Sequence, residues 1–510
     1  MLNGYNYGIV ILQCLFLNSI LYNHMSKEVR QLEPKNVWNK FADLNAVPRP
    51  SKKEERVIQF MMDFGKSLGL ETFKDEVGNV IIRKSASVGM ENRKMVTLQS
   101  HLDMVHQKNA DTVFDFDAQG IEMKIEGDWV KAKGTTLGAD NGMGVAAIMA
   151  LLESDTVAHP ALEALFTIDE ETGMTGAMGL KGGVLQGEIL LNLDTEEDDE
   201  IDIGCAGGID VTATRNYKEV DVPKNHIAYQ ITVKGLQGGH SGMDIHRGFG
   251  NANKIMNRLL YMASESFKIG VSEINGGSLR NAIPRESLAV IVVDEKQGAN
   301  LEKGLLNLLE TIKHELQYTE PQLSIGLVKV ELPSAMMEKE TQLKLIKSIY
   351  AAKNGVYAMS AAMDDLVETS NNIARVIVKN GLLEIMCLTR SSVNSAKLDL
   401  ATSLKCAFEL AGCEVTLSGD YPGWNPNPNS AILKVLENKY KAVFGDSANV
   451  VACHAGLECG ILGKNYPEMD MISFGPTIKG AHSPDERVSI PSVQKFWKFL
   501  LEILKDIPLK

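Results

Sequence analysis

The sequence predicts an α/β protein whose first domain is interrupted by a second domain of α+β type. Short apolar and β-branched runs alternate with helical or glycine-rich stretches near both ends of the chain, at residues 79–83, 95–99, 162–167, 189–193 and 471–474. Such runs are typical of strands that are buried on both faces of a sheet. A length of 510 residues also exceeds what one ordinary hydrophobic core supports. We therefore expect at least two domains.

The chain before the first strand is predicted to be helical. Val37, Trp38 and Phe41 recur at helical spacing. Residues 51–54, Ser-Lys-Lys-Glu, have the form of a capping box, in which a serine and a glutamate three residues later cap the start of a helix. We expect a second helix to begin there.

After residue 208 the pattern changes to that of an inserted domain. A strand–helix–strand–strand–helix–strand order fits residues 228–332, and a similar passage follows over 342–418. This order suits a doubled ferredoxin-like domain. Three prolines and one glycine in 421–429 mark its end, after which the first pattern returns. The predicted limits are 25–208 with 423–510 for the α/β domain and 209–422 for the insertion.

Composition excludes several classes of protein. Hydrophobic residues make up 44% of the chain and charged residues 23%, which fits a folded protein and not a multi-span membrane protein. The formal charge of −13, with no long Lys/Arg run, argues against nucleic-acid binding, because phosphate affinity needs a basic face. The seven cysteines form no C-x-x-C pair and are odd in number, which favours reduced thiols. We expect a cytoplasmic protein without nucleic-acid or membrane partners.

The first 24 residues are predicted to be an extension upstream of the true start, which we place at Met25. Their apolar run, 9–17, is not preceded by Lys or Arg and lacks a small-residue cleavage site, as a secretory signal would need. The run is also too short to span a bilayer securely.

Histidines and carboxylates stand directly after the predicted strands, where an open α/β sheet places its binding crevice. They are His101, Asp103, Asp140, Glu170, Glu171, Asp194 and His482. Two imidazoles and three carboxylates suffice for two divalent ions of zinc type when one carboxylate bridges them. Such a pair lowers the pKa of a shared water and polarises a substrate carbonyl, so only a general base must be added. One of two adjacent glutamates can bind a metal ion while its neighbour moves protons. Adjacent side chains at the end of an extended strand point in different directions, so the two roles can be separated.

Four motifs around these residues resemble those of the bacterial aminoacyl-histidine dipeptidases. They are Ser-His-Leu-Asp-Met-Val-His at 100–106, Leu-Gly-Ala-Asp-Asn-Gly at 137–142, Asp-Glu-Glu-Thr-Gly at 169–173 and Leu-Asn-Leu-Asp-Thr-Glu-Glu at 191–197. These enzymes belong to the co-catalytic zinc metallopeptidase superfamily that includes glutamate carboxypeptidase, aminoacylase, peptidase T and carnosinase. The likeness runs from about residue 36 onward.

The resemblance implies roles for the residues that follow the strands. His101 and Asp194 would bind one ion and Glu171 and His482 the other, with Asp140 and a water bridging them. Glu170 would be the general base, and Asp103 would orient His101. Zinc is the expected metal, with cobalt and manganese as alternatives. The likeness also implies a cis peptide bond between Asp140 and Asn141.

The insertion resembles the lid domain of the superfamily. This resemblance implies that the domain would close over the metal site. His240, in Gln-Gly-Gly-His-Ser-Gly, would donate a hydrogen bond to the developing oxyanion. Asn281 would contact the substrate, and Arg390, in Leu-Thr-Arg-Ser-Ser, would hold its free carboxylate. His454 and Glu458 resemble a segment near the active site and would contact the amino end of the substrate.

The expected activity is hydrolysis of dipeptides of the Xaa-His type, such as β-alanyl-histidine. An N-acyl amino acid deacylase and a tripeptidase remain alternatives, because the metal machinery does not depend on what flanks the amide. A non-catalytic metal- or peptide-binding protein is a further alternative, against which Glu170 argues, since binding needs no proton shuttle. His106 and His246 are given structural or supporting roles, and a homodimer through the lid domain is compatible with the superfamily.

Overall fold

A computed structural model describes residues 26–510, and this part of the chain forms two compact units. The first unit contains the chain up to Ile203 together with Asn427–Ala452 and Ile461–Lys510. The second contains Gly204–Pro426 and the short segment Cys453–Gly460. The sequence did not predict that this short segment would belong with the insertion. The predicted extension 1–24 lies outside the described residues, and the functional domain limits 25–208, 423–510 and 209–422 remain predictions.

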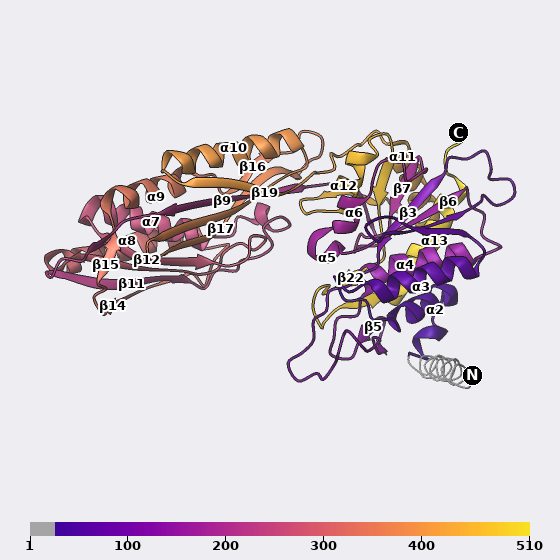
Figure 1. Ribbon diagram of the computed structural model, residues 1–510, viewed down its shortest axis with the longest axis horizontal. Coiled ribbons are helices and arrows are strands. Elements are labelled where there is room, and N and C mark those ends of the chain that lie inside the picture. The colour runs from indigo at the N-terminus through magenta and orange to yellow at the C-terminus, as the bar shows by residue number, and fades with distance from the viewer. Residues whose placement is uncertain (1–25) are drawn as a thin grey trace, which may run out of the picture. The chain divides into compact units, whose positions relative to one another are not determined.

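The first unit is built on a mixed eight-stranded sheet (Figure 1). In spatial order its strands are β1 (Glu71–Lys74), β2 (Val80–Lys84), β6 (Leu162–Thr167), β3 (Val96–His101), β7 (Ile189–Asn192), β21 (Asp470–Ser473), β8 (Glu200–Cys205) and β20 (Asn449–Cys453). The four central strands run parallel, whereas β1 and β2 are antiparallel additions at one edge. Every residue of β3, β6 and β7 is buried, as expected for strands covered on both faces. The predicted α/β class and its five strands are confirmed.

The longer helices of the first unit come from both parts of the chain that build its sheet. They are α2 (Lys35–Asn45), α3 (Glu55–Ser67), α4 (Ala139–Glu153), α11 (Ala431–Phe444) and α13 (Ile490–Lys505). The predicted helical residues Val37, Trp38 and Phe41 form the buried face of α2. The predicted capping box is wrong. The Ser51 hydroxyl donates to the Met104 carbonyl, and the Glu54 carboxylate accepts from the Lys52 amide at 2.7 Å, so neither side chain caps α3.

A small second sheet holds the loop 480–486 in the first unit. Its strands are β22 (Ile478–Lys479), β23 (Arg487–Ser489), β5 (Trp129–Ala132) and β4 (Met123–Glu126), in that order. Because β22 and β23 pair antiparallel, the loop between them is closed at its base.

The second unit is built on one antiparallel sheet of nine strands. In order they are β14 (Ser324–Val330), β11 (His226–Lys234), β13 (Ser287–Asp294), β12 (Gly270–Gly277), β17 (Val367–Lys379), β18 (Leu382–Ser391), β9 (Gly207–Asn216) and β19 (Glu414–Tyr421), with β16 (Gly355–Met359) also on β17. The two predicted strand–helix passages meet where β12 pairs with β17. The doubled α+β domain is thus a single continuous sheet.

Four helices cover one face of this sheet (Figure 1). They are α7 (Ala252–Phe267), α8 (Gly298–Glu315), α9 (Lys339–Ala351) and α10 (Asn394–Leu410). Their apolar side chains form one hydrophobic core with alternate residues of the strands, as in β9 and β11. Alternation of buried and exposed positions is expected for an antiparallel sheet with one covered face.

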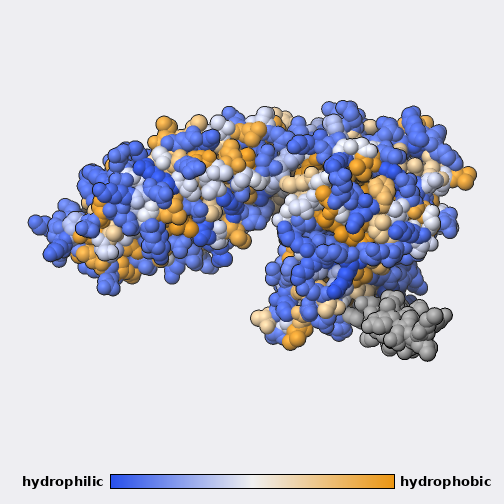
Figure 2. Space-filling view, in the orientation of Figure 1, coloured by the Kyte–Doolittle hydropathy of each residue, from blue (hydrophilic) through white to orange (hydrophobic). Residues whose placement is uncertain are grey.

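Hydrophilic side chains occupy most of the face shown in Figure 2, and apolar residues lie between them in small groups. Within residues 26–510, no helix has both the length and the apolar character needed to cross a bilayer.

A row of buried polar side chains links the central strands of the first unit. The Thr195 hydroxyl lies 2.8 Å from both the Ser473 hydroxyl and the Asp202 carboxylate, and Ser473 donates to Asn192. Burial raises the pKa of Asp202 to about 7, although the Thr195 hydrogen bond opposes this effect. The folded chain therefore binds a proton at Asp202 between about pH 4 and pH 7 that the unfolded chain releases.

Replacement of Asp202 by Asn is expected to stabilise the protein more at pH 8 than at pH 5. The pKa of Asp202 is raised in the fold, so the wild-type free energy of unfolding falls as the pH rises through that window, whereas asparagine does not titrate. The melting temperature of Asp202→Asn relative to wild type should rise by roughly 2–4 °C between the two pH values. An equal difference at both pH values would contradict this assignment.

Candidate active site

The predicted ligand side chains collect where the parallel strands of the first unit end. His101 is the last residue of β3, and Asp194 stands two residues beyond β7. Glu171 follows β6, and His482 lies in the loop between β22 and β23. Asp140 is in the first turn of α4, a helix that packs beside β3. Carboxyl ends of adjacent parallel strands meet at one edge of a sheet, which explains the convergence of residues distant in sequence.

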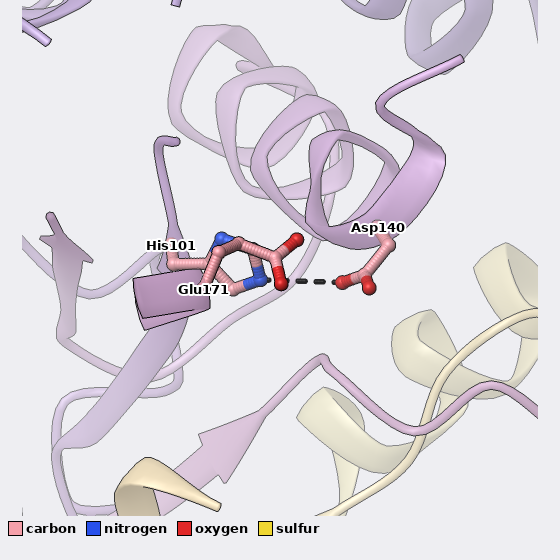
Figure 3. A group of neighbouring side chains, drawn as sticks. All are labelled: His101, Asp140 and Glu171. Atoms are coloured by element: carbon pink, nitrogen blue, oxygen red, sulfur yellow. Dashed lines mark hydrogen bonds and ion pairs between the residues drawn. The ribbon is translucent and has the colours of Figure 1, made fainter. Parts of the chain in front are cut away.

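Asp140 lies between two imidazoles. Its Oδ1 is 3.2 Å from His101 Nε2, and its Oδ2 is 3.3 Å from His482 Nε2. His482 Nε2 is also 2.9 Å from the Glu171 carboxylate. Figure 3 shows the side chains of His101, Asp140 and Glu171 pointing toward one another. The predicted cis peptide bond between Asp140 and Asn141 is confirmed.

His101 is held by carboxylates on both ring nitrogens. Its Nδ1 lies 3.4 Å from the Asp103 carboxylate, and its Nε2 lies 3.6 Å from Asp194 Oδ1. Asp103 also accepts hydrogen bonds from the amides of Glu170 and Glu171, at 3.0 and 3.3 Å. One buried carboxylate therefore fixes the His101 ring and the backbone of the glutamate pair together.

The charges of this cluster suit divalent cations. The hydrogen bonds of Asp140 and Glu171 raise the pKa of His482 to about 11, and burial raises the pKa values of Asp194 and Glu171. Asp194 Oδ1 is buried without a hydrogen-bond partner, which is costly for a carboxylate oxygen. Ligand atoms of His101, Asp140 and Glu171 all lie within 4.8 Å of one another. Oxygen and imidazole donors in this number match the ligands that zinc-type ions take.

Glu170 and Glu171 differ from the sequence prediction in their backbone. They do not continue an extended strand end but begin a one-turn helix, α5 (Glu170–Gly173), after Asp169 in the left-handed region. Successive side chains of a helix point about 100° apart. The two glutamates therefore still diverge, but through helical rather than strand geometry.

Glu486 was missed by the sequence analysis. Its buried carboxylate accepts hydrogen bonds from the amides of Leu137, Gly138, Ala139 and Asp140, at 2.7, 3.0, 2.7 and 3.2 Å. Burial raises its pKa to about 7, whereas the amides favour the ionised form. Because it follows His482 by four residues, Glu486 connects the loop that carries one imidazole to the backbone that carries Asp140.

Arg49 supports the same turn from the other side and was also missed. Its buried guanidinium donates to the carbonyls of Leu102, Asp103 and Gly138 and to the Asn45 side chain. Burial lowers its pKa to about 10, so it stays charged at neutral pH. Only tertiary contacts reveal Glu486 and Arg49, because neither lies at the end of a predicted strand.

In the second unit, His240 has a defined tautomer. Its Nδ1 accepts hydrogen bonds from the amides of Gly242 and Met243, at 3.2 and 3.0 Å. A neutral imidazole whose Nδ1 is an acceptor carries its proton on Nε2. His240 can therefore donate from Nε2, as stabilisation of an oxyanion requires.

The structure places Asn281 beside His240. The Asn281 carbonyl accepts a hydrogen bond from the Ser241 amide at 2.7 Å, and His240 forms an isolated β-bridge with Ala282. The buried Asn372 side chain donates to the carbonyls of Arg280 and Ala282, which fixes the turn that presents Asn281.

Arg390 and His454 are buried in the second unit as well. Arg390 donates to the Tyr421 hydroxyl at 3.0 Å, and His454 Nε2 lies 2.8 Å from the Ser370 hydroxyl. Burial and the charge of Arg390 lower the pKa of His454 to about 3, so this imidazole is neutral. Glu458 is the buried first residue of α12 (Glu458–Asn465).

Two further histidines considered in the sequence analysis, His106 and His246, are exposed. His106 packs its ring edge-on against Phe116, and His246 lies in a short 3-10 helix, Ile245–Arg247. The structural or supporting roles given to them in the sequence analysis stay predictions.

Comparison with known proteins identifies the family to which the chain belongs. The model of peptidase family M20/M25/M40 matches residues 97–506. The chain belongs to this family. The M20 chain is 45% identical to the cytosol non-specific dipeptidase of Escherichia coli (strain K12) over 95% of its own length and the whole of the relative. It superimposes on an aminoacylhistidine dipeptidase from Vibrio alginolyticus with a TM-score of 0.88 and 42% identity, covering 94% of this chain and 98% of that one. An aminopeptidase PepT from Bacillus cereus, 14% identical with a TM-score of 0.55, shares the fold over 93% of this chain and 99% of that one.

Replacement of Glu486 by Gln is expected to weaken divalent-metal affinity by about 10–100-fold. The glutamine amide is uncharged and has one acceptor oxygen in place of two, so it cannot bind all four backbone N–H groups. The turn that positions Asp140 is then held less firmly. Competition with a chromophoric chelator measures the affinity without turnover. Glu468→Gln, at an exposed position of the same unit, is the matched control. Equal metal affinity in wild type and Glu486→Gln would refute the role.

Proposed function

We propose that this M20 chain is a metal-dependent dipeptidase that cleaves the peptide bond of Xaa-His dipeptides, β-alanyl-histidine among them. The observation that carries the proposal is the Asp140 carboxylate with one oxygen toward His101 and the other toward His482. The relatives named for dipeptide hydrolysis cover nearly the whole chain and support the same conclusion.

In this proposal, His101 and Asp194 would serve one divalent cation, Glu171 and His482 would serve a second, and Asp140 would serve both. Two zinc ions bound there would polarise the scissile carbonyl and lower the pKa of water. The buried Asp194 Oδ1, which has no hydrogen-bond partner and lies 3.6 Å from His101 Nε2, and the short His482–Glu171 contact support this ligand set.

The proton is moved by Glu170. Its backbone is fixed by the Asp103 carboxylate, which also sets the orientation of the His101 ring. Because Glu170 begins α5 one residue before Glu171, its carboxylate is directed differently from that of the proposed ligand. It can take a proton from the attacking water and deliver it to the leaving amine.

Side chains of the second unit are proposed to recognise the substrate. His240 donates its Nε2 proton to the oxygen of the tetrahedral intermediate, since its Nδ1 is already an acceptor. Arg390 binds the free carboxylate, and Asn281 contacts the peptide beside His240. His454 and Glu458 are proposed to face the amino end of the dipeptide. We further propose a cytoplasmic protein, in accord with the cytosol relative, that forms a homodimer through its lid domain, residues 209–422.

Hydrolysis of a substrate panel tests the proposed function. Zinc-reconstituted protein is expected to cleave β-Ala-His, Gly-His and Leu-Gly and to leave N-acetyl amino acids intact, because acetylation removes the free amino end that His454 and Glu458 are proposed to face. Release of free histidine or glycine is measured by chromatography. Preference for the acetylated compounds would replace the dipeptidase by a deacylase.

Replacement of Glu170 by Ala is expected to lower kcat by about 10²–10⁴-fold while the bound metal persists. The substitution removes the proton acceptor but none of the proposed ligand atoms. Turnover is measured together with metal content by atomic emission. Near-normal kcat in a metal-loaded Glu170→Ala variant would refute the base assignment.

A further inference from the structure

Arg390 is a buried cation without a carboxylate partner among the described residues. Its residue surface is 4% exposed, and its side chain donates hydrogen bonds to two neutral hydroxyls, Tyr421 at 3.0 Å and Ser241 at 3.5 Å. Asp210, an acidic side chain on which the charge of Arg390 acts, is engaged by Arg280 at 3.2 Å. Burial of an unpaired charge is costly, so this arrangement favours an anionic ligand.

Tyr421 reaches Arg390 across an intervening strand. Arg390 on β18 pairs with Gly208 on β9, and Gly208 pairs with Tyr421 on β19. Residues paired in this way direct their side chains to the same face of a sheet. A Cβ at position 208 would lie 2.6 Å from the Tyr421 hydroxyl oxygen and 2.7 Å from its ring carbons. The glycine is therefore what lets the phenol ring cross β9.

A β-bulge determines that a tyrosine occupies this position. Asp210 pairs with Ser418, but Gly208 pairs with Tyr421, so β19 has one extra residue between the two pairs. Gly419, inside the bulge, has a φ of +59°, a conformation that glycine adopts without strain. Without the extra residue, Asp420 would face Gly208 and could neutralise Arg390. Instead, Asp420 forms an ion pair with Lys397 at 2.7 Å.

The Tyr421 hydroxyl can serve Arg390 and a ligand together. Its oxygen accepts from Arg390 Nη1, which leaves its own proton to donate. Burial raises the pKa of Tyr421, so the hydroxyl stays protonated at neutral pH. His454, neutral because burial lowers its pKa to about 3, adds no second positive charge.

We propose that Tyr421, admitted by Gly208 and the bulge of β19, is a specificity-determining residue that fixes Arg390 and donates a second hydrogen bond to a carboxylate bound there. The site then distinguishes a ligand with a free α-carboxylate, such as the C-terminal residue of a dipeptide, from the corresponding amide. This inference rests on the proposed function, in which Arg390 meets the substrate carboxylate.

The test is steady-state kinetics of Tyr421→Phe, which keeps the ring and removes the hydroxyl. We expect KM for a dipeptide substrate to rise about tenfold, since a hydrogen bond to a charged group is lost, while kcat changes by less than about twofold. The inhibition constant of free histidine should rise with it, and that of histidinamide should not. In an Arg390→Lys background, Tyr421→Phe should add little, because the tyrosine acts with the guanidinium.

Gly208→Ala provides an independent test that leaves Tyr421 in place. The added methyl group should displace the phenol and reproduce the rise in KM. Gly326→Ala is the matched control in β14 of the same sheet, because a Cβ there meets nothing nearer than 4.0 Å. Its kinetics should equal those of wild type.

Wild-type turnover of dipeptides tests the proposed function separately from Tyr421. If wild type cleaves dipeptides and Tyr421→Phe leaves KM and the preference for histidine over histidinamide unchanged, the proposal is overturned. If dipeptides prove not to be substrates, calorimetric titration of wild type and Tyr421→Phe with histidine and histidinamide decides the same preference without turnover.

Discussion

The site depends on one carboxylate that must satisfy two imidazoles at once. Asp140 has His101 at 3.2 Å on one oxygen and His482 at 3.3 Å on the other, so a rotation that favours one contact weakens the other. Such a group has to be fixed by its backbone. Glu486 holds the four amides that end at Asp140, Arg49 holds the Gly138 carbonyl, and the Asn141 side chain donates to the Leu193 carbonyl. The precision of the cluster is therefore set by residues that have no place in the ligand set.

The same supports connect the ligand segments with one another. Glu486 belongs to the loop of His482, and Leu193 precedes Asp194. Asp103 binds both the His101 ring and the amides of the glutamate pair. Each segment that contributes a ligand is thus hydrogen-bonded to another such segment. A disturbance at one strand end is transmitted to its neighbours, as is usual for supporting contacts around metal ligands.

The sequence could predict which strands carry the chemistry, but not how the side chains are supported. Buried strands such as β3 and β6 are visible as apolar runs, and polar residues that follow them point to the crevice of the sheet. Glu486 stands in a loop of mixed polarity, where one carboxylate among several has no distinguishing spacing. The predicted Ser51–Glu54 capping box is wrong for a similar reason. Ser51 donates to the distant Met104 carbonyl and Glu54 accepts from the nearby Lys52 amide, so neither side chain binds the end of the helix. The pairing of Tyr421 with Gly208 depends on a bulge, and register is not encoded in local periodicity.

Each unit contains buried charge that is incompletely paired: negative charge in the first unit and positive charge in the second. In each case the fold holds the charged groups in place. In the first unit, four carboxylates gather around two imidazoles, and one buried oxygen of Asp194 has no hydrogen-bond partner. In the second, the Arg390 guanidinium has only hydroxyl partners within the described part of the chain, while the acids Asp210 and Asp420 are engaged by Arg280 and Lys397. Folding alone would favour neutralising each cluster with an internal partner, because unpaired buried charge destabilises a protein. Two features work against that outcome: the bulge that removes Asp420 from Arg390, and the excess of carboxylates around His101 and His482, with which no lysine or arginine of residues 26–510 forms an ion pair. Both features are explained if cations bind to the first cluster and a carboxylate binds to Arg390. Binding of these ligands to the native state would then stabilise the fold.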